Sequence, residues 1–273
     1  MKRSTGGYEL IQKQLGEIDG VVVRQDTQIG EMIAQAVGLP WEAKNKYAIH
    51  RLPADKKVKN DPDDATGWSP TGAELKALEP FMRAQEESWF CTRIVLQCLG
   101  CGYLRPLKMH FTVAGDTGDA YVMERPYKCG GGLCCPLEMR LNGLSGENGE
   151  VKHIGRIPYT DVERAAGLMA TYEKRYSLRV NLSCCGRVNN CCAPSCFRND
   201  AVYDVLDPDG AVVANLQVSF GSGECLKAFC RASGGFTNYV LQFPRDSTPT
   251  DRALLLAALF QLDYAIFEKK AQQ

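Results

Sequence analysis

Cysteine is the residue type through which this chain could most readily do chemistry, because its thirteen cysteines fall into tight groups. The first group is Cys129, Cys134 and Cys135 in KCGGGLCCP, which holds an adjacent pair beside a run of glycines. An exposed pair of this kind is a candidate acceptor for S-acylation. Small thiols also fill tight turns, so the sequence leaves an acylation site and a structural role both open.

Other cysteines could hold zinc through their thiolates. They are one C-x2-C pair and a later run, namely Cys98, Cys101, Cys184, Cys185, Cys191, Cys192 and Cys196. No second pair follows at zinc-finger spacing, and His50, His110 and His153 are scattered singly, which favours buried or turn thiols. The opening MKRSTGGYEL lacks the apolar segment of a secretory signal. We therefore expect reduced thiols rather than a disulfide framework.

Covalent catalysis and nucleic-acid binding are both poorly supported. The chain contains no GxSxG, P-loop or HExxH motif, and nothing in the sequence brings a cysteine to His110, which alternates outward on an expected strand. Lysine plus arginine and aspartate plus glutamate number 32 each, so the formal charge is zero. A neutral chain lacks the electrostatic attraction that usually holds nucleic acid. We expect neither an enzyme nor a nucleic-acid partner.

The element that must organise the chain is a C-terminal apolar segment. Thr248, Pro249 and Asp251 form a helix-start signature, and from 253 to 267 only Gln261 and Asp263 interrupt an apolar run. A helix with no broad polar face must be surrounded by protein or by lipid. Fifteen residues reach about 22 Å, short of a bilayer core of roughly 30 Å. We therefore expect a helix over 249–268 that fills a protein core, with a membrane-spanning helix as the alternative.

The expected helix identifies residues of the core. Those expected to form the core are Leu255, Leu259, Leu262, Asp263 and Ile266. A carboxylate in such a setting needs a hydrogen-bonding partner or a place near an open end. Asp263 is therefore the one helix residue whose surroundings should be polar.

The rest of the chain is expected to wrap this helix with short antiparallel strands. Apolar and polar residues alternate with a period of two, which is typical of half-buried strands. The expected strands are 20–25, 46–49, 107–113, 120–124, 137–141, 176–180, 201–206, 212–218 and 239–243. A short helix is expected over 26–37, and a polar tail or a fraying helix over 1–19. An exposed insertion is expected over 53–80, partly disordered at 53–70, with a second tail over 269–273. Closure into a barrel would remove exposed strand edges, so 20–268 is expected to form a single, mainly β domain.

At this point the residues carry a resemblance to a known family. The chain resembles the phospholipid scramblases in an ordered set of stretches: VVVRQ…EMI, NKYAI, FCTR, MERPYKC…CCPLEMRL, SCFRNDAVYDVLDPDG, LKAF and NYVLQFPRD. They cover about residues 20–268. The resemblance implies a tubby-like fold, a barrel of about twelve strands threaded by a hydrophobic C-terminal helix.

The resemblance also implies a function. It is ATP-independent movement of phospholipids between membrane leaflets, at the cytoplasmic face of a membrane, with the plasma membrane preferred and a cytosolic pool allowed. Membrane phospholipids are then the expected partners. Tubby-like proteins with other duties share the fold, so a soluble lipid-sensing or regulatory module without transport is the alternative.

Two further expectations come from the family. Its cysteine cluster is S-acylated, which places candidate lipid anchors at Cys129, Cys134 and Cys135. Its calcium loop aligns with 235–246, where Thr237, Asn238 and Asp246 remain but only Asp246 is acidic. Because Ca²⁺ needs several carboxylates, we expect calcium binding to be weakened or lost, with an ordinary strand at this position. The family's basic import segment aligns with 216–228, which holds one lysine, so a nuclear role is not expected.

Overall fold

The computed structural model describes residues 6–26, 45–87, 106–125, 137–145, 150–160, 165–170, 173–179, 200–219 and 238–264. Its three helices in this part of the chain are α1 (Gly7–Gly16), α3 (Gly72–Ala77) and α6 (Pro249–Leu262). The strands are β1 (Gly20–Asp26), β2 (Lys46–Arg51), β3 (Pro80–Glu87), β4 (Leu107–Val113), β5 (Asp119–Arg125), β6 (Leu137–Ser145), β7 (Glu150–Thr160), β8 (Ala165–Ala170), β9 (Glu173–Arg179), β10 (Asp200–Leu206), β11 (Val212–Ser219) and β12 (Asn238–Gln242).

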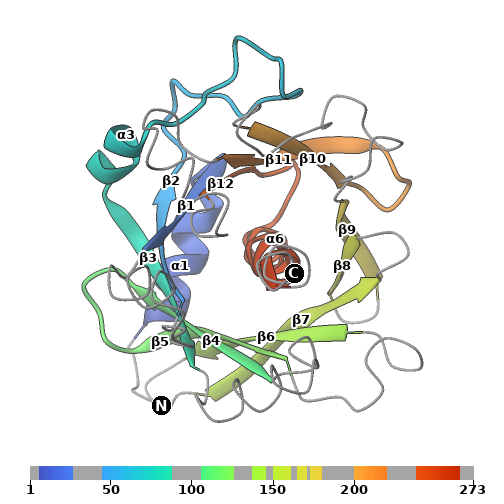
Figure 1. Cartoon of the computed structure of the whole chain (residues 1–273). Helices are drawn as coiled ribbons and strands as arrows, with labels where there is room; N and C mark the ends of the chain where they lie inside the picture. The colour runs from blue at the N-terminus through green and yellow to red at the C-terminus, as the bar shows by residue number, and fades with distance from the viewer. Residues whose placement is uncertain are drawn as a thin grey trace, which may run out of the picture.

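The strands pair antiparallel in an order that returns to its start. Each strand from β2 to β11 is hydrogen-bonded to the one before it and the one after it, while β1 pairs with β2 on one side and β12 on the other. In Figure 1 the strands form a ring seen end-on, and α6 lies in its centre. The prediction of a mainly β, antiparallel fold with a C-terminal helix is confirmed.

Helix α6 begins as its sequence predicted. The hydroxyl of Thr248 accepts a hydrogen bond from the backbone N–H of Asp251, and the Asp251 carboxylate accepts one from the backbone N–H of Thr248. Every residue from Asp251 to Leu262 is buried. The apolar side chains that point inward from the surrounding strands meet this helix in one continuous core. One apolar cavity between α6, Leu15 and Phe111 is too small for more than about one water molecule.

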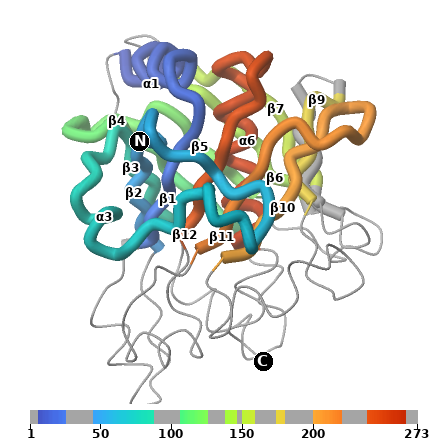
Figure 2. Tube along the Cα trace, turned by 90° about the horizontal axis from the view of Figure 1, so that it is seen from above, coloured from blue at the N-terminus to red at the C-terminus, as the bar shows by residue number. Residues whose placement is uncertain are grey.

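Of the two structures expected for the N-terminal segment, a polar tail or a fraying helix, the structure shows a helix, and one face of it is buried. Residues 7–16 form α1, in which Ile11 and Leu15 are fully buried. Figure 2 shows α1 beside the first turns of α6. Arg252 of α6 donates hydrogen bonds to the carbonyl oxygens at the end of α1 and just beyond it, at Leu15, Gly16 and Ile18. This arginine joins segments more than 230 residues apart in the sequence.

Residues 53–80 differ from the expectation of an exposed, partly disordered insertion. Helix α3 and strand β3 begin within this range, and the segment before them lies against the outside of the barrel. Val58, Trp68 and Leu75 are buried in a second, smaller cluster with Val22 and Val240, which point outward from β1 and β12. Charged residues are clustered in this segment, but its few apolar side chains attach it to the barrel. The helix expected at 26–37 lies almost wholly outside the described residues.

Candidate functional site

The end of the barrel at which α6 finishes holds a cluster of buried polar groups around Asp263. The hydroxyl of Tyr47 on β2 donates a hydrogen bond to Asp263 Oδ2 at 2.7 Å, and the hydroxyl of Tyr239 on β12 donates one to Oδ1. Both tyrosines are almost fully buried. The partner that the sequence required for Asp263 is therefore a pair of tyrosine hydroxyls.

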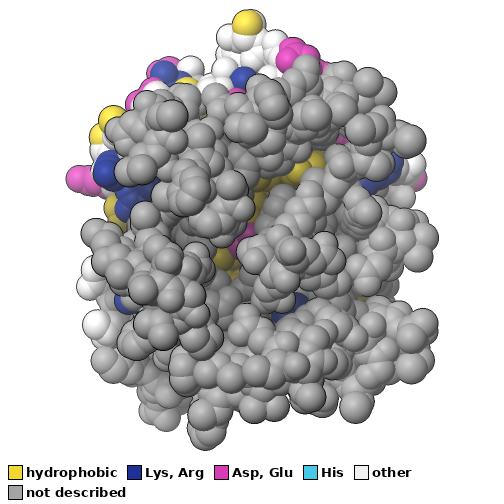
Figure 3. Space-filling view, viewed as in Figure 1, with side chains coloured by type: hydrophobic (Ala, Val, Ile, Leu, Met, Phe, Trp, Pro, Cys, Tyr) yellow, Lys and Arg dark blue, Asp and Glu magenta, His cyan; other side chains and the backbone are white. Residues whose placement is uncertain are grey.

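A second carboxylate lies beside the first. Glu86 of β3 is 1% exposed, and its Oε2 accepts hydrogen bonds from the Tyr264 hydroxyl at 3.0 Å and from the Asn45 side-chain amide at 3.1 Å. Asn45 Nδ2 also lies 3.2 Å from the Tyr264 oxygen. The last turn of α6 is thus tied to β2, β3 and β12 at once. Figure 3 looks onto this end and shows described hydrophobic and acidic side chains near its middle.

Burial sets the electrostatics of this cluster. Removal from water raises the pKa of Asp263, and the nearby Glu86 carboxylate raises it further, while the two tyrosine hydroxyls lower it. Burial and the Asp263 charge also raise the pKa of Tyr47 well above its ordinary value. The Tyr47 hydroxyl therefore stays protonated and acts as a donor. The arrangement holds the end of the helix through hydrogen bonds, and no nucleophile is activated in it.

The other predicted helix residues lie where the sequence placed them. Leu255, Leu259 and Leu262 are 0–1% exposed inside the barrel. Ile266 lies outside the described residues. Glu86, Tyr47 and Tyr239 could not be identified from the sequence as partners of α6, because they come from three strands that only the topology brings together.

The end of the barrel around Asp263 is here called the helix-end rim. In an antiparallel ring, every second connection lies at the same end. At the helix-end rim the first strand of each of six pairs ends and the second begins: β1–β2, β3–β4, β5–β6, β7–β8, β9–β10 and β11–β12. All thirteen cysteines fall, in sequence, between strand pairs of this set. The acylation candidates Cys129, Cys134 and Cys135, like the cysteines considered for zinc, lie outside the described residues. Among the residues described, no group of three or more metal-binding side chains occurs.

The remnants of the calcium loop are not brought together by the fold. Thr237 lies outside the described residues, and Asn238 is the first residue of β12, at the helix-end rim. Asp246 is exposed beyond the opposite end of the same strand. The four residue steps of β12 alone span roughly 13 Å in an extended strand. Asn238 and Asp246 therefore cannot bind one ion while β12 is intact.

Calorimetric titration of the protein with Ca²⁺ is expected to show no binding at micromolar concentration. One carboxylate supplies too little charge to offset dehydration of the ion, and the strand separates the remaining oxygen ligands. Asp246→Ala serves as the matched variant. Micromolar binding in the parent protein that disappears in this variant would overturn the expectation.

A histidine on the outside of the barrel is held between two carboxylates. His110 on β4 lies 2.8 Å from Asp119 of β5 through Nδ1 and 2.7 Å from Glu87 of β3 through Nε2. Both ring nitrogens can donate only when the imidazole is protonated. The hydrogen bond to Asp119 raises the pKa of His110, and Glu87 raises it further, although burial opposes both. Since Glu87 occupies the second nitrogen, His110 is placed to join three strands rather than to activate a nucleophile.

This histidine predicts a pH dependence of stability. The pKa of His110 is higher in the folded chain than its ordinary value near 6.5, so its contribution is fully present below pH 6.5 and is lost as pH rises through the raised pKa. Urea denaturation between pH 6 and pH 9 should show a falling free energy of unfolding. His110→Gln should flatten that decline. An equal decline in the variant would assign it to other groups.

Comparison with known proteins gives a match to a family model and none to a solved structure. The family model described as Scramblase matches residues 76–269, which run from α3 through β3 and the remaining strands to the end of α6 and beyond. The match covers well over half of the chain and includes ten of the twelve strands and the central helix. The chain therefore belongs to the Scramblase family.

Proposed function

We propose that this protein acts on membrane phospholipids as a scramblase, moving them between leaflets or assisting that movement without ATP. The observation that carries the proposal is the family match over residues 76–269, which covers the barrel from β3 onward together with α6. The strand order and the central helix also support a tubby-like barrel. Lipid handling of this kind breaks no covalent bond, so the proposed activity is translocation rather than enzymatic catalysis.

The helix-end rim is the part of the barrel best suited to meet the membrane. The chain between its flanking strands carries every cysteine, including the glycine-flanked pair Cys134 and Cys135. An acyl chain adds roughly 0.8 kcal/mol of membrane affinity per buried CH₂, and stable attachment takes two such signals. Two or more acylated cysteines at this rim would hold the barrel at the cytoplasmic face of a membrane, for which the plasma membrane is the proposed site. Unacylated chains would form a cytosolic pool.

Attachment through the rim is consistent with the position of α6. Its apolar surface is buried against the strands, so in this conformation it is not available to lipid. Among the described helices, none combines the length and the apolar character needed to cross a bilayer.

The alternative function is lipid sensing or regulation without transport. It is favoured by the filled interior, because α6 occupies the centre of the barrel and leaves lipid no route through it in this conformation. Transport would then have to follow the outer surface of the barrel or require movement of α6. A sensing module would need neither.

Liposomes that contain a fluorescent phospholipid in both leaflets separate these functions. The purified protein is added to vesicles, its binding is measured by flotation, and leaflet exchange is measured by quenching the outer-leaflet probe. Binding with quenching beyond that in protein-free vesicles supports the scramblase. Binding with exchange no faster than in protein-free vesicles supports the sensing module. Absence of binding by the acylated protein would contradict both.

Replacement of the acylation candidates is expected to detach the protein from membranes. The double variant Cys134→Ser, Cys135→Ser should shift from the membrane pellet to the soluble fraction of eukaryotic cells. The variant Cys98→Ser, Cys101→Ser is the matched control. Its two cysteines lie between β3 and β4 and are not among the acylation candidates. An unchanged distribution in the first variant would assign Cys134 and Cys135 a structural role.

A further inference from the structure

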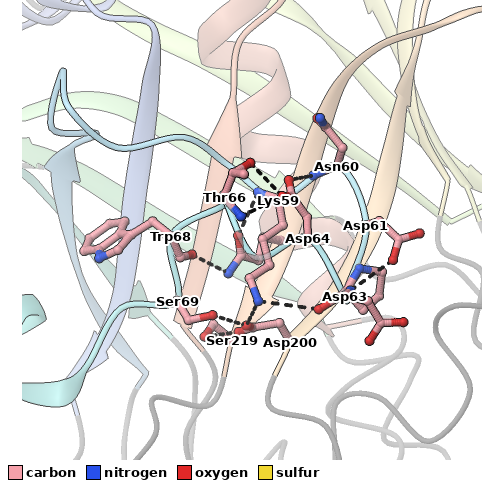
Figure 4. Close-up of polar contacts among 12 residues, drawn as sticks. Lys59, Asn60, Asp61, Asp63, Asp64, Thr66, Trp68, Ser69, Asp200 and Ser219 are labelled. Atoms are coloured by element: carbon pink, nitrogen blue, oxygen red, sulfur yellow. Dashed lines mark hydrogen bonds and ion pairs between the residues drawn. The ribbon is translucent and has the colours of Figure 1, made fainter.

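Residues 57–69, here called the strap, cross the outside of the barrel over β10 and β11 and reach β1 and β12. Figure 4 shows the strap lying over the strands, with the side chains of Lys59 and Ser69 directed at Asp200. The strap makes no strand pairing with the barrel; side chains hold it in place.

A single glutamine of β11 holds both ends of the strap. Gln217 is fully buried, although it points outward from the barrel. Its Oε1 accepts a hydrogen bond from the backbone N–H of Lys59 at 3.1 Å, and its Nε2 donates one to the carbonyl oxygen of Trp68 at 2.9 Å. The Trp68 N–H in turn donates to the carbonyl oxygen of Lys57 at 2.8 Å. These contacts recognise main-chain groups, as peptide-binding sites do.

An acidic group beside Gln217 receives the lysine of the strap. Asp200 is 4% exposed and lies 2.9 Å from Lys59 Nζ. Its carboxylate also accepts hydrogen bonds from Ser219 at 2.5 Å and from the Ser69 hydroxyl. Burial alone would raise the pKa of Asp200, but these donors together lower it. The carboxylate is therefore charged and oriented toward the strap.

An apolar contact completes the surface. Val22 and Val240 point outward from β1 and β12, where a barrel normally carries polar residues, yet both are fully buried. They pack with Val58 and Trp68 of the strap. Without the strap these valines would form part of an apolar patch on the outside of the barrel, and a large exposed patch of that kind marks an interaction site.

We propose that this outer face, formed by Val22, Asp200, Gln217, Ser219 and Val240, is a peptide-binding site that the strap occupies as an intramolecular ligand. The partner it fits is a peptide with a lysine and a tryptophan nine residues apart and a turn between them. The lysine pairs with Asp200, and the tryptophan covers the two valines. Gln217 binds the backbone N–H of the lysine and the carbonyl oxygen of the tryptophan. Four of the five residues lie within the family match, whereas the strap precedes it. Most of the binding face therefore lies in the part of the chain that the family model matches, whereas the strap lies outside it.

The strap is tethered at both ends, so its occupancy does not require high intrinsic affinity. A short tether gives a roughly millimolar effective concentration, which keeps a weak ligand in place. A partner with the same chemistry can therefore compete for the face when the strap opens locally.

The test uses the full-length chain and a fluorescein-labelled peptide of residues 55–71. In the chain variant Lys59→Ala, Trp68→Ala the strap loses two of its side-chain anchors. The peptide should bind this variant at least about tenfold more tightly than the parent chain, where the strap competes. Adding Asp200→Asn to the variant, or Trp68→Ala to the peptide, should abolish that gain. Equal anisotropy curves for the parent chain and a folded double variant would overturn the proposal.

Hydrogen exchange on the unmodified chain gives a second test that needs no variant. The amides of Lys59 and Trp68 should exchange through local opening, at a lower opening free energy than the amides of β10 and β11. Added unlabelled peptide should speed their exchange by holding the strap open. Exchange of these two amides only through global unfolding would show that the strap is a fixed part of the fold and would overturn the proposal.

Discussion

Replacing Leu255 or Leu259 with aspartate is expected to abolish folding of the whole chain. Both side chains are 0% exposed in the centre of the barrel, where apolar residues of the surrounding strands contact α6. A buried carboxylate without a partner costs several kcal/mol, against a total stability of about 5–15 kcal/mol. Far-ultraviolet circular dichroism and urea denaturation measure the effect. Val213→Asp is the control, because Val213 is 41% exposed on β11 and should tolerate the charge.

The same pair of variants tests the alternative placement of the helix. If α6 were a membrane anchor, Leu255→Asp and Leu259→Asp would leave a folded, soluble barrel that no longer sediments with membranes. That outcome would contradict the central position of α6 and would return the spanning helix as the better interpretation.

The second large effect is expected at Arg252. This guanidinium is 8% exposed, and its Nη1 donates to the carbonyl oxygens of Leu15 at 2.6 Å, Ile18 at 2.8 Å and Gly16 at 3.2 Å. Arg252→Leu leaves these carbonyl groups without their donor, and each buried unsatisfied group costs about 1–3 kcal/mol. The positive charge also favours the C-terminal end of α1. We expect a loss of roughly 3–5 kcal/mol in the free energy of unfolding.

Urea denaturation of Arg252→Leu should show a lower midpoint with an unchanged slope. Arg175→Leu is the matched control. Its side chain is 42% exposed and contacts Asp251 at 3.3 Å, so its loss should cost no more than about 1 kcal/mol. Equal, small losses in the two variants would mean that α1 adds little to the barrel, as expected of the polar tail or fraying helix that the sequence suggested.

The elements that the sequence predicted well are those with a strong local signal. Strand β4 alternates strictly between buried and partly exposed residues, and it was expected at its observed bounds, 107–113. Helix α6 carries its own capping residues and an apolar surface on every side. In each case the pattern that selects the structure lies within the element itself.

The elements that were missed depend on distant partners. Strand β3 begins with Pro80 after a polar stretch, and its buried Glu86 accepts hydrogen bonds from Tyr264 and Asn45. Strand β7 begins with four exposed residues and contains a glycine and a proline, so it lacks regular alternation. In α1, Ile11 and Leu15 are spaced for a helix face, but their burial requires α6. The strap was expected to be exposed because its charged residues outnumber the valine and tryptophan that attach it.

The candidate site likewise combines a feature that the local sequence predicts with features that depend on distant partners. The need of Asp263 for a polar partner could be inferred from its apolar neighbours alone. The identity of that partner could not, because Tyr47 and Tyr239 lie on opposite sides of β1 in the ring, 192 positions apart in the sequence. The cysteine-bearing segments can be identified one by one in the sequence, whereas only the strand order shows that the strands flanking them share one rim of the barrel.

The pairing of β1 with β12 has a consequence for the synthesis of the protein. While the chain is being made, β1 exposes an unpaired edge until residues 238–242 have emerged, and the helix that fills the core follows last, at 249–262. Contacts of such long sequence separation form slowly, and open edges invite pairing with other chains. The nascent protein therefore has neither a closed sheet nor a filled core until most of the chain has been synthesised. A premature stop that removes only the last tenth of the chain should leave an aggregation-prone product rather than a slightly shortened barrel.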